Sequence, residues 1–179
     1  MVRLKNILFL LLGLCALSTG CRKSDFFSTD DKITYRDRGT GTGTVTWKKE
    51  NDILIEGLVF VNDGQILTIE PGTVVRFRAG QGENSSALVV ARGGRILAQG
   101  TPEEPIIFTA EADDLEEAVP PNSRGLWGGI ILLGNAPVNI SAGESSIEGI
   151  PSSEPRAYYG GNNPESNSGI LKYVSIRYG

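Results

Sequence analysis

The sequence contains no histidine, one methionine and two cysteines among its 179 residues. Without histidine, the chain cannot form a Ser-His-Asp or Cys-His nucleophile system or an imidazole metal site. Any enzyme chemistry would depend on carboxylates, lysine, arginine or tyrosine. The net charge is only −4, and aromatic residues make up 7% of the chain. No basic stripe with interleaved aromatics occurs, so nucleic acid is not an expected partner.

Glycine, in contrast, is abundant, with 23 residues, and it accompanies short apolar runs rich in β-branched side chains. This composition is typical of all-β structure with tight turns. No segment between these runs shows helical periodicity, so a sheet built from βαβ units is not expected. The remaining architectures are a β-sandwich and a β-solenoid.

Residues 1–20 predict a signal peptide. Arg3 and Lys5 form a positively charged start, and the apolar segment 7–17 is shorter than a membrane-spanning helix. The stretch LSTGC, which ends at Cys21, resembles the lipobox of bacterial lipoproteins. In that family the signal is cut before the cysteine, which is then acylated. The alternative is an ordinary secretory signal with an incidental cysteine.

Removal of residues 1–20 would leave Cys21 as the only cysteine, so no disulfide could form within the chain. A lone thiol in an oxidising compartment requires an explanation, and acylation provides one. The sequence thus predicts an envelope lipoprotein, anchored to the outer membrane by its lipid and exposed at the cell surface. Residues 21–46 are expected to form the lipidated end and a flexible tether, and 47–179 the folded domain. An edge strand near 44–47 is the alternative.

Two segments repeat a common pattern. DGQILTIEPGT (63–73) and GGRILAQGT (93–101) share a glycine, a polar residue, Ile-Leu, a spacer and Gly-Thr, which aligns Gly64 with Gly94. Such repeats favour a right-handed parallel β-helix over a β-sandwich, because stacked coils bury a core that no coil buries alone. Further strands are expected at 74–77, 105–109, 129–133, 138–140 and 171–177.

Alternation with a period of two predicts which side chains of the strands point into the coil. The inward pairs are Leu67 and Ile69, Val75 and Phe77, Leu88 and Val90, Ile106 and Phe108, and Val174 and Ile176. The chain ends at LKYVSIRYG, in a strand of a new coil and without the polar capping repeat that solenoids need. We therefore expect a solenoid that is incomplete at its C-terminus, or an end-to-end dimer through the last coil.

The chain also resembles a family, the β-helix lipoproteins and secreted proteins on the surface of some Gram-negative bacteria. An ordered series of segments carries the resemblance: LVFVNDGQILTIEPGTVVRF (58–77), RGLWGGIILLGNAPVN (124–139), IEGIP (147–151) and LKYVSIRYG (171–179). It covers about 53–179. The resemblance implies the β-helix fold and a surface location, and it implies no catalytic residues.

The segment GLWGGIILLGN (125–135) combines four consecutive aliphatic residues with tryptophan and four glycines. It is too short to span a membrane, and it lacks the lysine and the following helix of a phosphate-binding loop. We predict a bend at the two glycines beside Trp127 and then a buried strand at 130–133. Four aliphatics in a row indicate that both faces are covered, one by the coil interior and one by the long insertion 141–168.

Two loops carry candidate binding residues. In EADDLEEAVPPNSR (111–124), weak Ca²⁺ candidates are Asp113, Asp114 and Glu116, but the spacing of a known Ca²⁺ loop is absent. A solvated acidic loop is preferred, and no cofactor is expected.

In RAYYGGNNPESNSG (156–169), exposed tyrosine and asparagine suit sugars or peptides through stacking and hydrogen bonding. The candidate ligand-binding residues are Tyr158, Tyr159, Asn162 and Asn163. The alternative is an ordinary loop whose tyrosines pack on the solenoid.

These features predict a surface lipoprotein that acts as a binding or adhesion module, for glycans or for a surface protein. The alternatives are a carbohydrate-active enzyme of the polysaccharide-lyase kind and a structural part of a surface assembly. A lyase would need basic residues, which the chain supplies as Arg76, Arg78 and Arg92, but the sequence shows no recognisable arrangement of catalytic residues around them. Because fold alone does not assign function, enzyme activity is the less favoured expectation.

Overall fold

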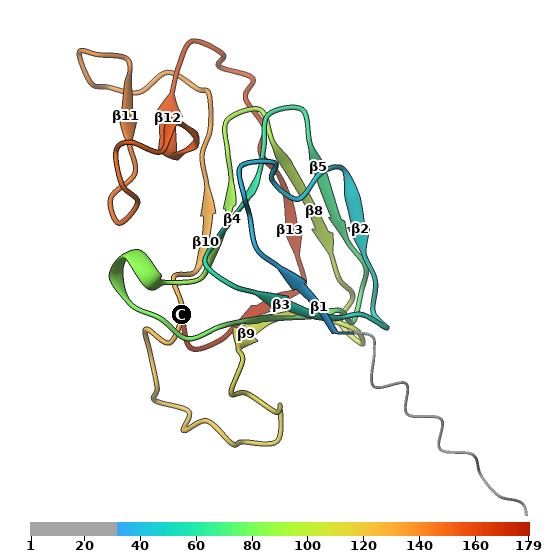
Figure 1. Ribbon diagram of the computed structural model, residues 1–179. Coiled ribbons are helices and arrows are strands. Elements are labelled where there is room, and N and C mark those ends of the chain that lie inside the picture. Colours follow the sequence, from blue (N-terminus) through green and yellow to red (C-terminus); the bar gives the residue numbers. More distant parts are fainter. Residues whose placement is uncertain (1–31) are drawn as a thin grey trace, which may run out of the picture.

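Three parallel sheets form the walls of a parallel β-helix in the computed structural model, which describes residues 32–179 (Figure 1). We call the three sheets A, B and C. From β3 onward the chain visits them in the repeating order A, C, B, whereas the first coil passes from sheet A to sheet B without a strand in sheet C. Sheet A contains β1 (Lys32–Tyr35), β3 (Asp52–Ile55), β6 (Val74–Phe77), β9 (Ile106–Ala110) and β14 (Val174–Ile176). Sheet C contains β4 (Leu58–Val61), β7 (Ala87–Val90) and β10 (Ile130–Leu132). Sheet B contains β2 (Val45–Trp47), β5 (Ile66–Ile69), β8 (Arg95–Gln99) and β13 (Gly169–Lys172).

All strand pairs within these three sheets are parallel, which confirms the predicted β-helix and excludes the antiparallel β-sandwich. Ile53 pairs with Val75, and Val75 pairs with Phe108. Apolar side chains therefore stack in the same row from one coil to the next, and each coil covers the interior of its neighbour.

Inward-facing side chains fill the space between the walls. Four of the five predicted inward pairs are at most 2% exposed, namely Leu67 and Ile69, Val75 and Phe77, Leu88 and Val90, and Ile106 and Phe108. The Phe77 ring stacks on Trp127 with a centroid distance of 3.9 Å. In the fifth pair, Val174 packs against the core but Ile176 is 53% exposed, because β14 has a neighbouring strand on one side only within the described residues.

The register of the two sequence repeats differs by one residue from the alignment that their pattern suggests. The pattern aligns Ile66 with Ile96, whereas the strands pair Leu67 with Ile96. A one-residue shift moves a side chain to the opposite face of a strand. Burial decides the register, since Leu67 and Ile96 are fully buried whereas Ile66 remains partly exposed.

The solenoid begins earlier than the sequence predicts. β1 pairs with β3 and β2 pairs with β5, and the N–H of Thr42 donates to the carbonyl of Phe60. Residues 32–46, expected to be part of the tether, therefore belong to the first coil, and β2 corresponds to the alternative edge strand. The predicted signal peptide and Cys21 lie outside the described residues.

Two predicted strands near the C-terminal end also differ from the structure. Residues 138–140 form no strand and belong to a loop. The expected strand 171–177 is divided between β13 and β14 by Tyr173, whose φ of 48° turns the corner between two walls. No helix among residues 32–179 has the length and hydrophobicity needed to cross a membrane.

Residues 134–168 leave the coil between β10 and β13, and we call them the insertion. They contain an antiparallel hairpin of β11 (Glu144–Ser146) and β12 (Tyr158–Gly160), with the short 3₁₀ turn η2 (Pro155–Ala157) just before β12. A second 3₁₀ turn, η1 (Gly82–Asn84), lies between β6 and β7. The hairpin lies outside the three walls, on the side of sheet C that carries β10 (Figure 1).

Candidate functional site

The insertion packs on the outer face of sheet C through a second hydrophobic cluster. This cluster contains Phe60, Ala87, Val89, Ala91, Leu133, Ile150 and Ala157, with Leu58, Ile131, Ile147 and Tyr159 packed against it. Both faces of β7 are consequently buried, and all four of its residues are at most 1% exposed. The apolar outer face of sheet C is thus explained by the insertion that covers it.

The strand of the GLWGGIILLGN segment is covered on both faces, with one exception. Ile130 packs against the coil interior, whereas Ile131 and Leu133 belong with the cluster under the insertion. Leu132, which pairs with Val90 and faces the same side as Ile130, is 45% exposed. The prediction of a buried strand is therefore wrong at Leu132, and Ile130 and Ile131 are only partly buried, because β10 has a neighbour on one side only within residues 32–179.

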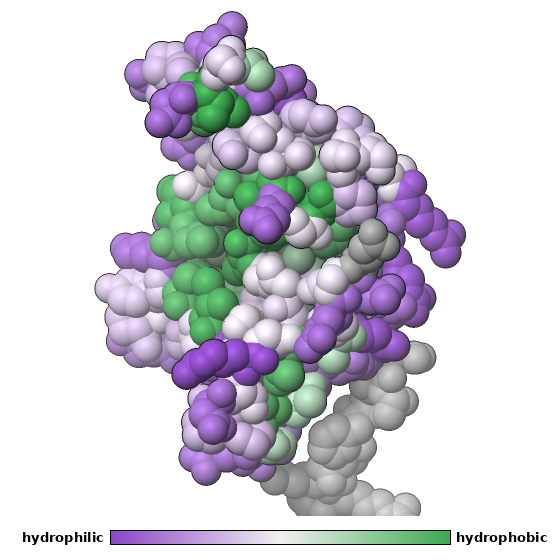
Figure 2. All heavy atoms as spheres, turned by 90° about the vertical axis from the view of Figure 1, so that its left-hand side faces the viewer, coloured by the Kyte–Doolittle hydropathy of each residue, from purple (hydrophilic) through white to green (hydrophobic). Residues whose placement is uncertain are grey.

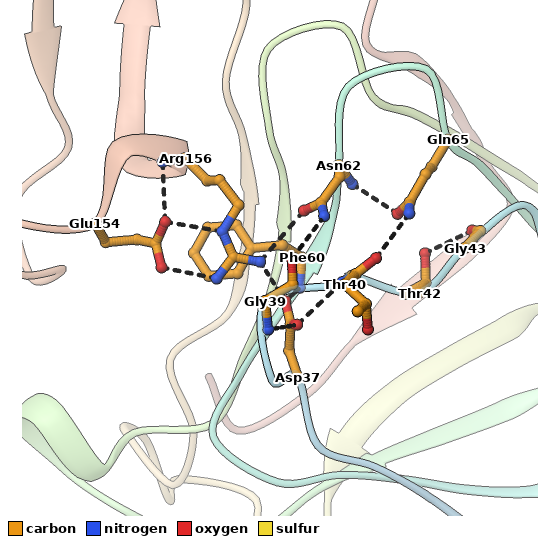
Figure 3. A network of polar contacts seen from close by, with 11 residues as sticks. Asp37, Gly39, Thr40, Thr42, Gly43, Phe60, Asn62, Gln65, Glu154 and Arg156 are labelled. Atoms are coloured by element: carbon orange, nitrogen blue, oxygen red, sulfur yellow. Dashed lines mark hydrogen bonds and ion pairs between the residues drawn. The ribbon is translucent and has the colours of Figure 1, made fainter.

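Arg156 joins the insertion to the first coil (Figure 3). Its guanidinium lies 3.9 Å above the centre of the Phe60 ring. It donates to the Asp37 carboxylate at 2.6 Å, and it makes two bonds to Glu154 at 2.8 and 2.7 Å. A longer bond of 3.3 Å reaches Asn62 Oδ1. We call this set of contacts the Arg156 clasp.

The acidic partners of the clasp are held in their charged form. Burial alone would raise the pKa of Asp37, but hydrogen bonds from the N–H groups of Gly41 and Gly39 and from Arg156 bring it below its ordinary value. The hydrogen bonds from Arg156 also lower the pKa of Glu154. In return, the hydrogen bonds to Glu154 and Asp37 raise the pKa of Arg156. The clasp is therefore fully ionised at neutral pH.

Cavities lie on both sides of Arg156, between the insertion and the wall of the solenoid. One, of about 390 Å³, is lined by Asp63, Ala91, Arg92, Gly93, Asn135, Pro155, Arg156 and Tyr158. The other, of about 430 Å³, is lined by Asp37, Leu58, Phe60, Ile150, Pro151, Ser153, Glu154 and Arg156. These volumes are in the range of small-molecule binding sites.

A third cavity, of about 230 Å³, continues from the second through their common lining residues Leu58 and Ile150, and it also contains Glu148. Together the three cavities follow the base of the insertion, and we call them the insertion furrow. A separate hollow of about 260 Å³ lies by Leu132, Val138, Ile147 and Tyr159 and is mostly apolar. Figure 2, which faces this side of the molecule, shows apolar residues across its middle with polar residues around them.

The predicted ligand-binding residues occupy different places. Tyr158 is partly exposed and lines the first cavity of the furrow. Tyr159 packs against the cluster under the insertion, as the alternative interpretation expects. Asn162 and Asn163 are exposed and line none of the furrow cavities, and the Asn163 side chain accepts a hydrogen bond from the N–H of Glu165. Of the four residues, only Tyr158 faces the furrow.

Sequence reasoning missed Arg156 and Asp37, which stand 119 residues apart. A local signal was present in Glu154-Pro155-Arg156, because an acidic residue followed by proline favours a capped turn. The Glu154 carboxylate does cap η2, by accepting from the N–H of Arg156. The pairing with Asp37 has no local sequence signal, since it depends on how the coils stack.

The acidic residues proposed for Ca²⁺ stabilise their own loop. The Asp113 carboxylate, 1% exposed, accepts hydrogen bonds from the Thr109 hydroxyl at 2.6 Å and from the N–H of Leu115 at 2.9 Å. Asp114 accepts from the N–H groups of Glu116 and Ala118. No group of three or more metal-ligating side chains occurs within residues 32–179. The Ca²⁺ hypothesis gains no support from this arrangement.

The three arginines considered for a lyase mechanism are not brought together. Arg76 lies on β6 and Arg78 directly after it, in sheet A, whereas Arg92 follows β7 in sheet C. Each lies against a carboxylate: Arg76 against Asp52 at 3.1 Å, Arg78 against Glu56 at 3.4 Å, and Arg92 against Glu144 at 2.6 Å. An arginine that already has an anionic partner is poorly suited to act as a base.

Comparison with known proteins agrees with the fold. The family model described as "Pectate-lyase like beta helix domain" matches residues 39–179. No curated protein and no solved structure gives a significant match. The matched region contains β2 to β14, and thus all but the first strand of the stacked coils. From both the match and the architecture, this chain belongs to the family of pectate-lyase-like β-helix domains.

Proposed function

We propose that this protein is a glycan-binding module of the cell surface, with its binding site in the insertion furrow. The single observation that carries the proposal is the first cavity of the furrow, where an aromatic ring and several polar groups converge on a β-helix of the pectate-lyase-like family.

The chemistry of the first cavity suits a sugar. The Tyr158 ring offers an apolar face for stacking against a pyranose ring. The Asn135 amide and the Asp63 carboxylate can bond to hydroxyl groups. The site is also preorganised, because Arg92 is fixed by bonds to Glu144 and to the carbonyl of Gly160.

A glycan array followed by titration calorimetry tests the proposal. We expect the protein to retain a subset of glycans without cleaving them. Tyr158→Ala should weaken binding about fivefold or more, in line with the ~1–3 kcal/mol of an aromatic stacking contact. The matched control is Tyr173→Ala, because Tyr173 is 49% exposed and lines none of the furrow cavities. Retention of no glycan would contradict the proposal, and cleavage would assign an enzyme instead.

The location is a second part of the proposal. We propose that acylated Cys21 anchors the module to the outer membrane, on the evidence of the LSTGC segment and the lone cysteine that follows the signal. Cys21→Ser should abolish incorporation of labelled fatty acid and release the protein from the membrane fraction. Cys15→Ser is the matched control and should label like the wild type. Labelling of Cys21→Ser at the level of Cys15→Ser would exclude Cys21 as the acylated residue.

A further inference from the structure

The insertion furrow has an excess of negative charge. Four carboxylates line its three cavities, those of Asp37, Asp63, Glu148 and Glu154, against the two guanidinium groups of Arg92 and Arg156. Glu144, which contacts Arg92 at 2.6 Å, adds a fifth carboxylate at the edge. Because like charges repel, this balance disfavours an anionic ligand.

Both guanidinium groups already lie against carboxylates that offset their charge. Arg156 is bonded to Asp37 at 2.6 Å and to Glu154 at 2.7 Å, and only 22% of its side chain is exposed. Arg92 is bonded to Glu144 and to the carbonyl of Gly160. At Arg156 a ligand carboxylate would have to break one of these charge-assisted pairs, which are the strong kind of hydrogen bond. At Arg92 it would meet a positive charge that Glu144 already offsets.

The two other carboxylates, those of Asp63 and Glu148, have no arginine or lysine partner within the part of the chain that the structure describes. An uncharged sugar can donate its hydroxyl protons to such oxygens, because an ionised carboxylate accepts hydrogen bonds and cannot donate them. A uronic acid or sulfated sugar would place its own anion beside them. The carboxylates of Asp63 and Glu148 therefore favour a neutral glycan and disfavour an acidic one.

We infer that the insertion furrow binds a glycan segment without acidic groups, such as a neutral hexose or pentose polymer. This inference rests on the proposed function of the same site, and it names the class of ligand. It separates this protein from a receptor for acidic polysaccharides, in which arginine or lysine groups would be left unpaired to meet the anions.

The test compares neutral and uronate oligosaccharides of equal length on the purified protein, by calorimetry, at low and high salt and with Ca²⁺ or a chelator. We expect the neutral ligands to bind about tenfold more tightly or better, with little dependence on salt. Equal or tighter binding of the uronates, with or without Ca²⁺, would overturn the inference while leaving the glycan-binding function intact. Failure of every glycan to bind would instead reject the proposed function.

Substitution of the unpaired carboxylates gives a second readout. The double variant Asp63→Asn and Glu148→Gln should raise the ratio of uronate to neutral affinity about tenfold or more, because it removes two like charges and keeps the polar shape. Glu103→Gln is the matched control, since Glu103 is exposed on a loop outside the furrow and its loss should leave the ratio unchanged. An unchanged ratio in the double variant would show that these charges do not select the ligand.

Discussion

Removal of Arg156 is expected to loosen the insertion and destabilise the whole domain. Arg156→Ala breaks bonds of 2.6 Å to Asp37 and of 2.7 and 2.8 Å to Glu154. Breaking a buried ion pair costs about 3–5 kcal/mol. The loss should be smaller here, about 2 kcal/mol, because Arg156 is 22% exposed and Asp37 retains backbone N–H donors. Loss of the contact with the Phe60 ring adds about 0.5–1 kcal/mol.

Urea unfolding followed by fluorescence of the two tryptophans, Trp47 and Trp127, measures this loss. A decrease of 2–3 kcal/mol corresponds to a midpoint lower by about 1 M, for a slope of about 2 kcal/mol/M. The matched control is Arg36→Ala, because Arg36 pairs with Glu56 at 2.7 Å but is 57% exposed. Solvent screens such a pair, so the midpoint should not move measurably. If Arg156→Ala unfolded at the midpoint of this control, the clasp would contribute nothing to stability.

Three other outcomes follow from the core and the clasp. Phe108→Asp should prevent folding, because a buried carboxylate without a partner is costly. Glu103→Ala should melt like the wild type in calorimetry, and equal melting of the two variants would contradict the assignment of Phe108 to the interior. Gly169→Ala should expose β13 to amide exchange, since its Cβ would lie 1.8 Å from a backbone oxygen at a φ of 126°; slow exchange there would refute the predicted clash. The stabilisation contributed by Asp37 and Glu154 should be fully present above the ordinary carboxyl pKa and be lost as the pH falls toward their lowered pKa values. Denaturant titrations of Arg156→Ala should therefore show a weaker acid dependence than those of the wild type.

The sequence pattern predicted which side chains are buried more accurately in the central coils than in the strands at the edges of the sheets. Alternation within a strand identifies inward residues such as Val75 and Phe77 wherever a coil is covered on both sides. Alternation failed at Ile176, and the run of four aliphatics failed at Leu132. Both residues have the same chemistry as the buried ones but lie on strands with a single neighbour within the described residues. Exposure at those positions depends on the neighbouring coil, which local alternation does not encode.

At the candidate site, too, the local sequence indicated some residues, whereas only the tertiary structure placed them. Tyr158 could be singled out because tyrosine on a glycine-rich loop suits ligand binding. The neighbouring Tyr159 has the same local sequence signal, yet it packs against the cluster under the insertion. Successive residues of β12 point to opposite faces, so the position of that strand relative to sheet C decides which tyrosine faces the cavity.

By itself, the sequence determined the all-β class, the stacked short strands and the identity of most core residues, because these depend on composition and on periodicity within a few residues. Only the tertiary structure decided the register of the repeats, the start of the first coil and the make-up of the insertion furrow. Asp37, Asp63 and Arg92 come from three separate turns of the coils and Arg156 from η2 of the insertion, and coil stacking together with packing of the insertion brings them to one side of the molecule. Stacking is set by the summed burial of many residues, whereas a site depends on a few long-range contacts that leave no local pattern in the chain.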